Sequence, residues 1–162
     1  MKKSSILLII SIIALIIVSV IIGIMISFDN KLEKGIDKDN ELLLTCESES
    51  IKIDKNLVCR LSGKSSTYDV SAVSAKIENS NNFSITSLDI DFSWEGDGDD
   101  NFIALYTDEN KKNNFPIATF TINLINDNVD EISINIIENS FSDEYYEEHK
   151  LDDIVKVLKV DR

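Results

Sequence analysis

From Ile6 to Phe28 the chain carries no charged side chain, and almost every residue is Ile, Leu, Val, Ala or Ser. About 20 consecutive apolar residues are enough to cross the hydrocarbon layer of a membrane as a helix. A secretory signal peptide has a shorter apolar core that ends at a cleavage site between small residues, and this run offers no good site of that kind. Residues 6–28 are therefore predicted to be an uncleaved anchor in the lipid bilayer, with a cleaved signal peptide as the alternative.

The charges on either side of this run predict its orientation. Lys2 and Lys3 precede it, and Asp29 opens an acidic region beyond it. Basic residues favour the cytoplasmic side of a membrane. We therefore expect a single-pass signal-anchor protein of the cell membrane with four parts: a cytoplasmic tail (1–5), the transmembrane anchor (6–28), a polar stalk (29–40) and one extracellular domain (41–162).

The region beyond the anchor is strongly acidic. It holds 14 lysines and arginines against 29 acids, a net charge of −15. Such a surface excludes broad electrostatic binding of nucleic acid or of anionic lipid headgroups. The acids are typical of a solvated surface, and cation binding is the alternative use. The abundance of Ile, Asn and Lys, with few Arg and Pro, is typical of bacteria with AT-rich genomes.

Beyond the stalk, apolar residues recur at every second position, which is the period of a β-strand. No helical period follows the anchor. About eight or nine short strands separated by turn signals predict an all-β antiparallel sandwich. The predicted strands are 42–46, 51–53, 57–61, 70–77, 83–94, 102–106, 118–124, 132–136 and 154–160. The longest predicted connections are an acidic loop at 95–101, a charged turn at 108–114 and a polar loop at 140–149.

One predicted strand contains a shift in its apolar face. The buried face passes from Val70 and Ala72 to Val73, Ala75 and Ile77. A shift by one residue in an alternating pattern is what a β-bulge produces. We therefore expect a bulge near the start of this strand.

Cys46 and Cys59 are the only cysteines of the chain. Outside the membrane, two cysteines most often form a disulfide. Each lies on the apolar face of a predicted strand, where facing strands can bring the two sulfur atoms together. A structural disulfide inside the sandwich is therefore predicted, and two buried free thiols are the alternative.

The densest acidic cluster lies in the predicted loop after Trp94. Carboxylates on a loop that contains glycine can supply oxygen ligands to Ca²⁺, and the candidates here are Asp97, Asp99 and Asp100. The spacing is not that of an EF-hand. A solvated acidic turn without a cation is the alternative, and no cofactor is expected to be required.

Aromatic residues at loops are candidates for recognition, because exposed rings stack on sugars or anchor protein interfaces. Tyr145 and Tyr146 are adjacent in the predicted polar loop, so at least one of them is expected to face solvent. They are the predicted binding residues. Trp94 alternates with Phe92 and Ile90, which predicts that it lies in the core.

His149 is the only histidine, and it lies in an acidic stretch. One histidine beside acids could act as a general base with a serine, but no nucleophile motif is present among the many serines. Metal binding by Glu147, Glu148 and His149 is also disfavoured, because consecutive side chains of a strand point in different directions. No catalytic or metal-binding residue is therefore predicted here, and the protein is not expected to be an enzyme.

The order of these segments resembles cohesin-like domains, which are bacterial sandwiches related to carbohydrate-binding modules. The strand 69–77 is followed by an Ile- and aromatic-rich strand ending at Trp94, then by a segment reading Ile-Ala-Thr-Phe-Thr-Ile at 117–122, and finally by Phe-Ser-Asp at 141–143. The resemblance covers about residues 40–162. The glycine usual in the early strand is replaced by Ala72 or Ser74, and no dockerin-contacting pattern can be placed.

The resemblance implies a cohesin-like or Ig-like sandwich that works by binding. We therefore expect a membrane-anchored surface module that recognises a protein or a polysaccharide. The alternative is a structural accessory subunit of a membrane or cell-wall complex, in which the helix is the partner site.

Overall fold

The computed structural model describes residues 39–78 and 80–162, which form nine strands. The predicted cytoplasmic tail, the anchor and nearly all of the stalk lie outside these residues. Within the part of the chain that the structure describes, no helix has the length and apolarity needed to span a bilayer. The strands are β1 (Asn40–Cys46), β2 (Ser50–Lys52), β3 (Leu57–Ile77), β4 (Phe83–Ile90), β5 (Glu95–Gly98), β6 (Phe102–Leu124), β7 (Glu131–Asp143), β8 (Glu148–Lys150) and β9 (Ile154–Asp161).

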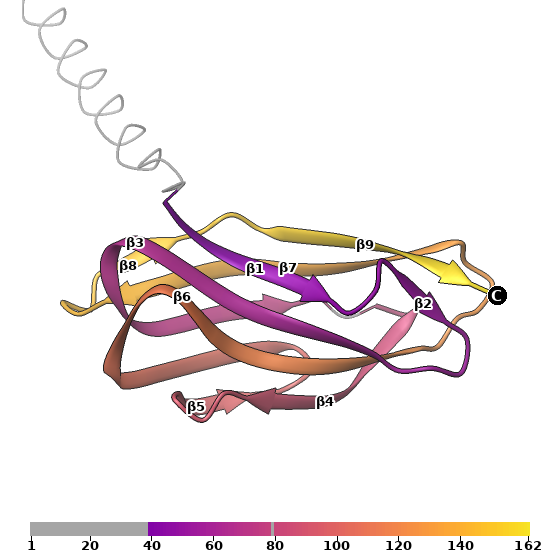
Figure 1. The fold of residues 1–162 in the computed structure, drawn as a ribbon, viewed down its shortest axis with the longest axis horizontal. Coiled ribbons are helices and arrows are strands. Elements are labelled where there is room, and N and C mark those ends of the chain that lie inside the picture. The colour runs from indigo at the N-terminus through magenta and orange to yellow at the C-terminus, as the bar shows by residue number, and fades with distance from the viewer. Residues whose placement is uncertain (1–38, 79) are drawn as a thin grey trace, which may run out of the picture. The chain divides into compact units, whose positions relative to one another are not determined.

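Two long strands build both layers of a sandwich. β3 and β6 pair antiparallel along most of their length, and both fold over at the same end of the domain (Figure 1). Each therefore places one half in each layer. The first layer contains β1, the first half of β3, the second half of β6, and β4.

The second layer contains the remaining halves of β3 and β6. Its order is β2, β9, β7, β3, β6 and β5, and β8 pairs with the end of β7. All of its pairs are antiparallel except one, because β2 runs parallel to the C-terminal strand β9. The antiparallel sandwich predicted from the sequence is therefore confirmed, with this single parallel pair as a departure.

Alternating apolar side chains from the two layers form the core. Side chains such as Phe120, Ile134 and Leu158 are completely buried. Burying one such side chain stabilises a fold by about 1.5–3 kcal/mol. The rings of Phe115 and Phe141 lie 5.6 Å apart between the layers, so aromatic contacts also join them.

The predicted bulge is confirmed. The register between β3 and both of its neighbours shifts between Val70 and Ala72. The shift lets Val70 and Val73 both face the core, although they are three residues apart.

The charged turn predicted at 108–114 is wrong, because these residues lie inside β6. Lys111 still pairs with Val70 of β3, and Asn113 pairs with Ser65. Asp108, Glu109 and Lys112 are exposed because both strands bend here from one layer to the other, whereas Lys111 is half-buried. The strands predicted separately at 57–61 and 70–77 are two halves of the single strand β3, which continues through the same bend.

The acidic loop predicted at 95–101 is also wrong in its first half. Glu95–Gly98 is the edge strand β5, which pairs with β6. Gly96 makes this pairing possible. Its φ is +131°, and a Cβ atom there would lie 2.3 Å from the carbonyl oxygen of Ala104.

The strand predicted over 83–94 ends earlier, because β4 stops at Ile90. Asp91 then begins a turn, since its Oδ1 accepts hydrogen bonds from the backbone N–H and the hydroxyl of Ser93. Trp94 is buried as predicted, and its indole N–H donates to the carbonyl of Pro116 at 2.7 Å. Phe92 does not alternate into the core and is 97% exposed.

The polar loop predicted at 140–149 is a hairpin. β7 continues to Asp143, the chain turns, and β8 then pairs back so that Phe141 faces His149. The sequence of this segment is polar because one of its faces is exposed.

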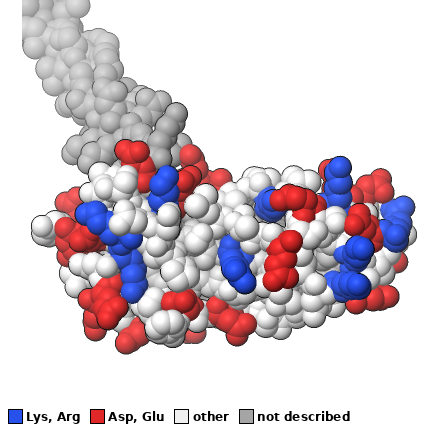
Figure 2. Space-filling view, in the orientation of Figure 1, with Lys and Arg blue, Asp and Glu red and all other residues white. Residues whose placement is uncertain are grey.

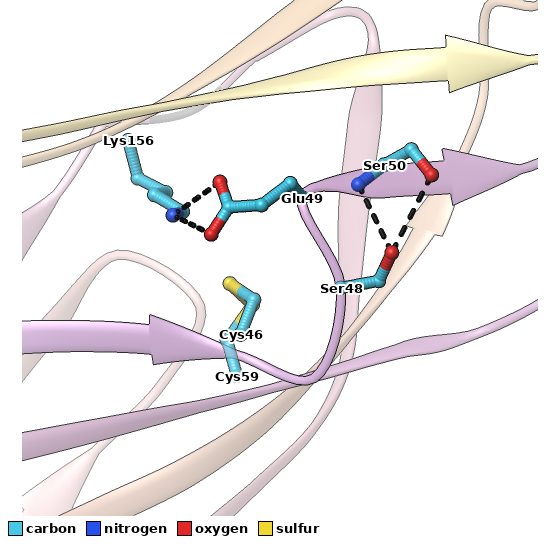
Figure 3. The surroundings of a disulfide bond; sticks show 6 residues. All are labelled: Cys46, Ser48, Glu49, Ser50, Cys59 and Lys156. Carbon is cyan, nitrogen blue, oxygen red and sulfur yellow. Dashed lines mark hydrogen bonds and ion pairs between the residues drawn. A yellow bond between two sulfur atoms is a disulfide. The ribbon is translucent and has the colours of Figure 1, made fainter.

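Cys46 and Cys59 form the predicted disulfide, and they face each other in the β1–β3 register. Cys59 is completely buried. Just beyond Cys46 the chain leaves the first layer for β2 in the second. Glu49 in this connection forms an ion pair with Lys156 of β9 at 2.7 Å, beside the disulfide (Figure 3). The crossing point between the layers is therefore held by a covalent bond and an ion pair.

Candidate protein-binding face and neighbouring hairpin

The outer surface of the second layer carries a patch of small side chains. Val73 and Leu105 point into the core, so their neighbours along each strand point outward. The register aligns Ser142, Ala72 and Tyr106 in one row across three strands. We call this patch the small-residue face, and its members are Ala72, Ser74, Ala104, Ser140 and Ser142. Together with surrounding residues they line a shallow depression of about 330 Å³.

Aromatic and charged side chains surround this face. Tyr106 is 52% exposed, and its hydroxyl donates to Glu95 at 3.0 Å. This hydrogen bond, with the negative charge of Glu95, raises the pKa of Tyr106. On another side, Lys76 forms an ion pair with Glu138 at 2.9 Å, and that hydrogen bond raises the pKa of Lys76. The rim therefore offers an aromatic anchor and groups of both signs.

The hairpin of β7 and β8 adjoins the small-residue face, because Glu148 of β8 lies beside Ser142. Asp143 organises its turn. The Oδ1 atom of Asp143 accepts hydrogen bonds from the backbone N–H groups of Tyr145 and Glu147, at 2.8 and 3.0 Å. Its Oδ2 atom lies 2.9 Å from Nε2 of His149. The hydrogen bond from His149 is the main cause that lowers the pKa of Asp143, and the two backbone N–H groups act in the same direction against the opposing effect of burial.

Tyr145 and Tyr146 lie at the tip of this hairpin and are 77% and 86% exposed. Tyr146 has a φ of +64°, and its N–H donates to the carbonyl of Asp143. At least one of them was expected to face solvent, and both do. Their role in binding stays a prediction.

His149 lies beneath the turn. Its ring stacks on that of Tyr68, with 4.0 Å between the ring centres. The ligand atoms of Asp143, Glu147 and His149 all lie within 4.8 Å of one another. Sequence reasoning considered Glu148 in place of Asp143. It missed Asp143 because the hairpin pairing, which cannot be seen from sequence spacing, brings β7 and β8 together.

Similar folds are known from solved structures. A cohesin module of a family 33 glycoside hydrolase from Clostridium perfringens aligns with 75% of this chain and 96% of its own, with a TM-score of 0.64 and 8% sequence identity. A cohesin from Clostridium thermocellum, solved in complex with a dockerin, aligns with 78% of this chain and 97% of its own, with a TM-score of 0.56 and 12% identity. This domain is a cohesin-like β-sandwich. The resemblance seen in the strand motifs is thereby confirmed for the fold.

A non-cellulosomal cohesin from the archaeon Archaeoglobus fulgidus has the same fold. It covers 76% of this chain and 92% of its own, with a TM-score of 0.56 and 6% identity. No protein-family profile matches the sequence, and no curated protein is significantly similar to it. At these identities the likeness establishes the architecture of the cohesin-like domain alone.

The three aspartates considered for Ca²⁺ are spread over β5 and the turn that follows it. Asp97 pairs with Ala104, at the edge of the small-residue face. Asp99 closes a turn, since its Oδ1 accepts hydrogen bonds from two backbone N–H groups, and Asp100 accepts one from Asn101. Among residues 39–78 and 80–162 they do not form a group of converging metal ligands, whereas Asp143, Glu147 and His149 do.

The first layer of the cohesin-like domain carries a larger groove, of about 730 Å³. Arg60, Asp89 and Phe92 are among its lining residues. Sequence reasoning missed this groove because the alternation from Ile90 placed Phe92 in a strand.

Acidic and basic side chains alternate over the face seen in Figure 2, and neither sign forms a continuous patch.

Proposed function

We propose that this chain is a membrane-anchored surface protein whose cohesin-like domain binds another protein through the small-residue face. The depression on that face, with Tyr106 exposed at its rim, is the observation that carries the proposal. Small side chains let the backbone of a partner approach closely, and tyrosine is enriched among the residues that dominate binding energy. The domain acts by binding and performs no chemistry.

The partner is a protein of the dockerin type. Support comes from the similar cohesins that were solved with dockerins. The rim also favours a partner with basic groups, because Glu148 lines the depression and Glu95 and Asp97 pair with residues at its edge. Complementary charge of this kind raises the association rate and makes it depend on salt concentration.

The test is calorimetric titration of the full-length chain, in detergent, with a panel of purified dockerins. The substitution Ala104→Arg fills the depression at an exposed position and should weaken binding by at least about tenfold. Ser87→Arg, at an exposed position of β4 in the first layer, is the matched control and should bind like the wild type. If no dockerin binds, or if Ala104→Arg binds normally, the proposal for this face is wrong.

Membrane display is the second part of the proposal. The uncharged run at 6–28 and the preceding Lys2 and Lys3 support a cytoplasmic N-terminus and an external domain. Protease added to intact protoplasts should remove an epitope attached after Arg162. Protection of that epitope until the membrane is broken would contradict the orientation.

Polysaccharide binding is a second candidate, and Phe92 is the observation that favours it. This ring is 97% exposed beside the groove of the first layer, where Arg60 and Asp89 offer hydrogen bonds. Exposed rings stack on the apolar faces of sugars. Electrophoresis of the protein through gels containing cell-wall polysaccharide should show retardation that Phe92→Ala removes. Equal mobility of both proteins with and without polysaccharide would reject this candidate.

A further inference from the structure

We propose that Asp143, Glu147 and His149 bind a divalent transition-metal ion such as Zn²⁺, and that the ion holds the hairpin that presents Tyr145 and Tyr146. The three side chains come from the end of β7, the turn and the start of β8. Their ligand atoms lie within 4.8 Å of one another. The inference concerns a different part of the domain from the floor of the small-residue face, and it does not depend on partner binding.

Asp143 is a fixed ligand. It is only 6% exposed, and Oδ1 is held by the N–H groups of Tyr145 and Glu147. The backbone is held as well, because the hydroxyl of Ser71 donates to the carbonyl of Asp143 at 2.6 Å. Hydrogen bonds of this kind around a ligating carboxylate fix its orientation and strengthen metal binding.

The Nε2 atom of His149 faces the carboxylate of Asp143. Stacking on Tyr68 fixes the plane of its ring, and its side chain is 30% exposed, which leaves a path from solvent. Two donors about 2.0–2.1 Å from a tetrahedral ion lie about 3.3–3.4 Å apart, so the side chains of Asp143 and His149 need to separate only slightly to admit one. The observed separation of Nε2 from Oδ2 of Asp143 is 2.9 Å. With that small movement a metal replaces the proton between these two atoms, while the imidazole keeps its other proton on Nδ1.

Glu147 supplies the third ligand. Its side chain is exposed, but its backbone is fixed, because its N–H binds Oδ1 of Asp143 and its carbonyl accepts the N–H of Asp143. One imidazole and two carboxylates favour Zn²⁺ or a similar transition metal over Ca²⁺, which prefers oxygen donors throughout. The two negative charges match the charge of the ion. Three protein ligands leave a fourth position for water.

Without a metal, the Asp143–His149 hydrogen bond joins the same two side chains, so a metal-bound and a metal-free hairpin must be separated experimentally. Metal-free full-length protein in detergent is titrated with Zn²⁺ against a chromophoric chelator. It is also titrated with Co²⁺, whose visible absorption reports the ligand geometry. We expect one equivalent to bind, with an absorption band typical of a nitrogen- and oxygen-ligated ion of low coordination number.

The variants are chosen to change ligands without disturbing the fold. Glu147→Gln should weaken Zn²⁺ binding by at least about tenfold, and His149→Gln should weaken it further. Glu144→Gln, an exposed acid in the same turn, is the matched control and should bind like the wild type. Circular dichroism of each metal-free variant verifies that it is folded.

The proposal is overturned if the wild type binds no Zn²⁺ at millimolar concentration. It is equally overturned if the two ligand variants, shown to be folded, bind with wild-type affinity. Dockerin titrations do not enter this test, so its failure and the failure of the proposed function are distinguishable.

Discussion

Asp143 illustrates how one side chain can organise a segment that looks like a polar loop in the sequence. It joins the turn to β8 through His149 and through two backbone N–H groups. A carboxylate that accepts several hydrogen bonds favours its ionised form, so its protonation weakens the folded state.

This arrangement predicts a pH dependence of stability. The pKa of Asp143 in the folded state is lowered from 3.8, so its contribution is fully present above that pH and is lost as the pH falls through the folded-state pKa. The free energy of unfolding, measured with denaturant from pH 7 to pH 2, should fall less steeply below pH 3.8 in Asp143→Asn than in the wild type. Glu144→Gln should retain the wild-type acid limb. Identical acid limbs for Asp143→Asn and the wild type would contradict the prediction.

Gly63 is required for packing between the layers. A Cβ atom at this position would lie 2.2 Å from the ring of Phe115. That ring cannot move freely, because it is buried against Trp94 and Phe141. Gly63→Ala should therefore lower the free energy of unfolding by about 1–3 kcal/mol, as overpacking does elsewhere. Denaturant titration measures the loss, and Ser62→Ala should stay within about 0.5 kcal/mol of the wild type. Equal stability of Gly63→Ala would show that the ring can adjust.

At the level of elements, strand positions were easier to predict than strand ends. The alternation of Leu57, Cys59 and Leu61 correctly identified buried positions of β3. The cluster of charges at 108–114 indicated a turn, but a strand that bends between layers also exposes charged residues without ending. Such a bend depends on long-range pairing, which is set by the partner strand and not by local composition.

The disulfide is the element-scale feature with the largest expected effect. It closes a loop with a sequence separation of 13 residues at the point where the chain changes layer. Replacing both cysteines by alanine should cost about 3 kcal/mol of unfolding free energy on the chain-entropy estimate. Denaturant titration with and without a reductant provides the check. The reductant should destabilise the wild type alone, and equal stability of all samples would contradict the prediction.

At the level of the whole molecule, the sequence was sufficient for the fold class and the cohesin-like architecture, because both depend on strand periodicity and order. It was insufficient for the small-residue face. Ala72, Ser74 and Ala104 have no chemical signature, and they form a surface only through the register of β3 with β6. The convergence of Asp143 with His149 was invisible for the same reason.

The small-residue face and the hairpin tip belong to neighbouring parts of the domain, which predicts that one partner contacts both. Replacing Tyr145 and Tyr146 by alanine should weaken capture of a dockerin that binds the wild type by at least about 1 kcal/mol, and the fold should stay intact. Calorimetric titration measures the change. Unchanged affinity would remove the tyrosines from the interface while leaving the role of Ala104 to its own test.

The disulfide also has a mechanical consequence for this domain. Tension applied at Asn40 acts first on β1, whose pairing with β3 runs from Asn40 opposite Ser65 to Cys46 opposite Cys59. The opening stops at Cys46, because the next link is covalent. The first mechanical event is thus limited to the length of β1, and the rest of the sandwich stays closed. In single-molecule stretching, a reductant should therefore lengthen the first extension step and lower the force at which the remaining strands come apart.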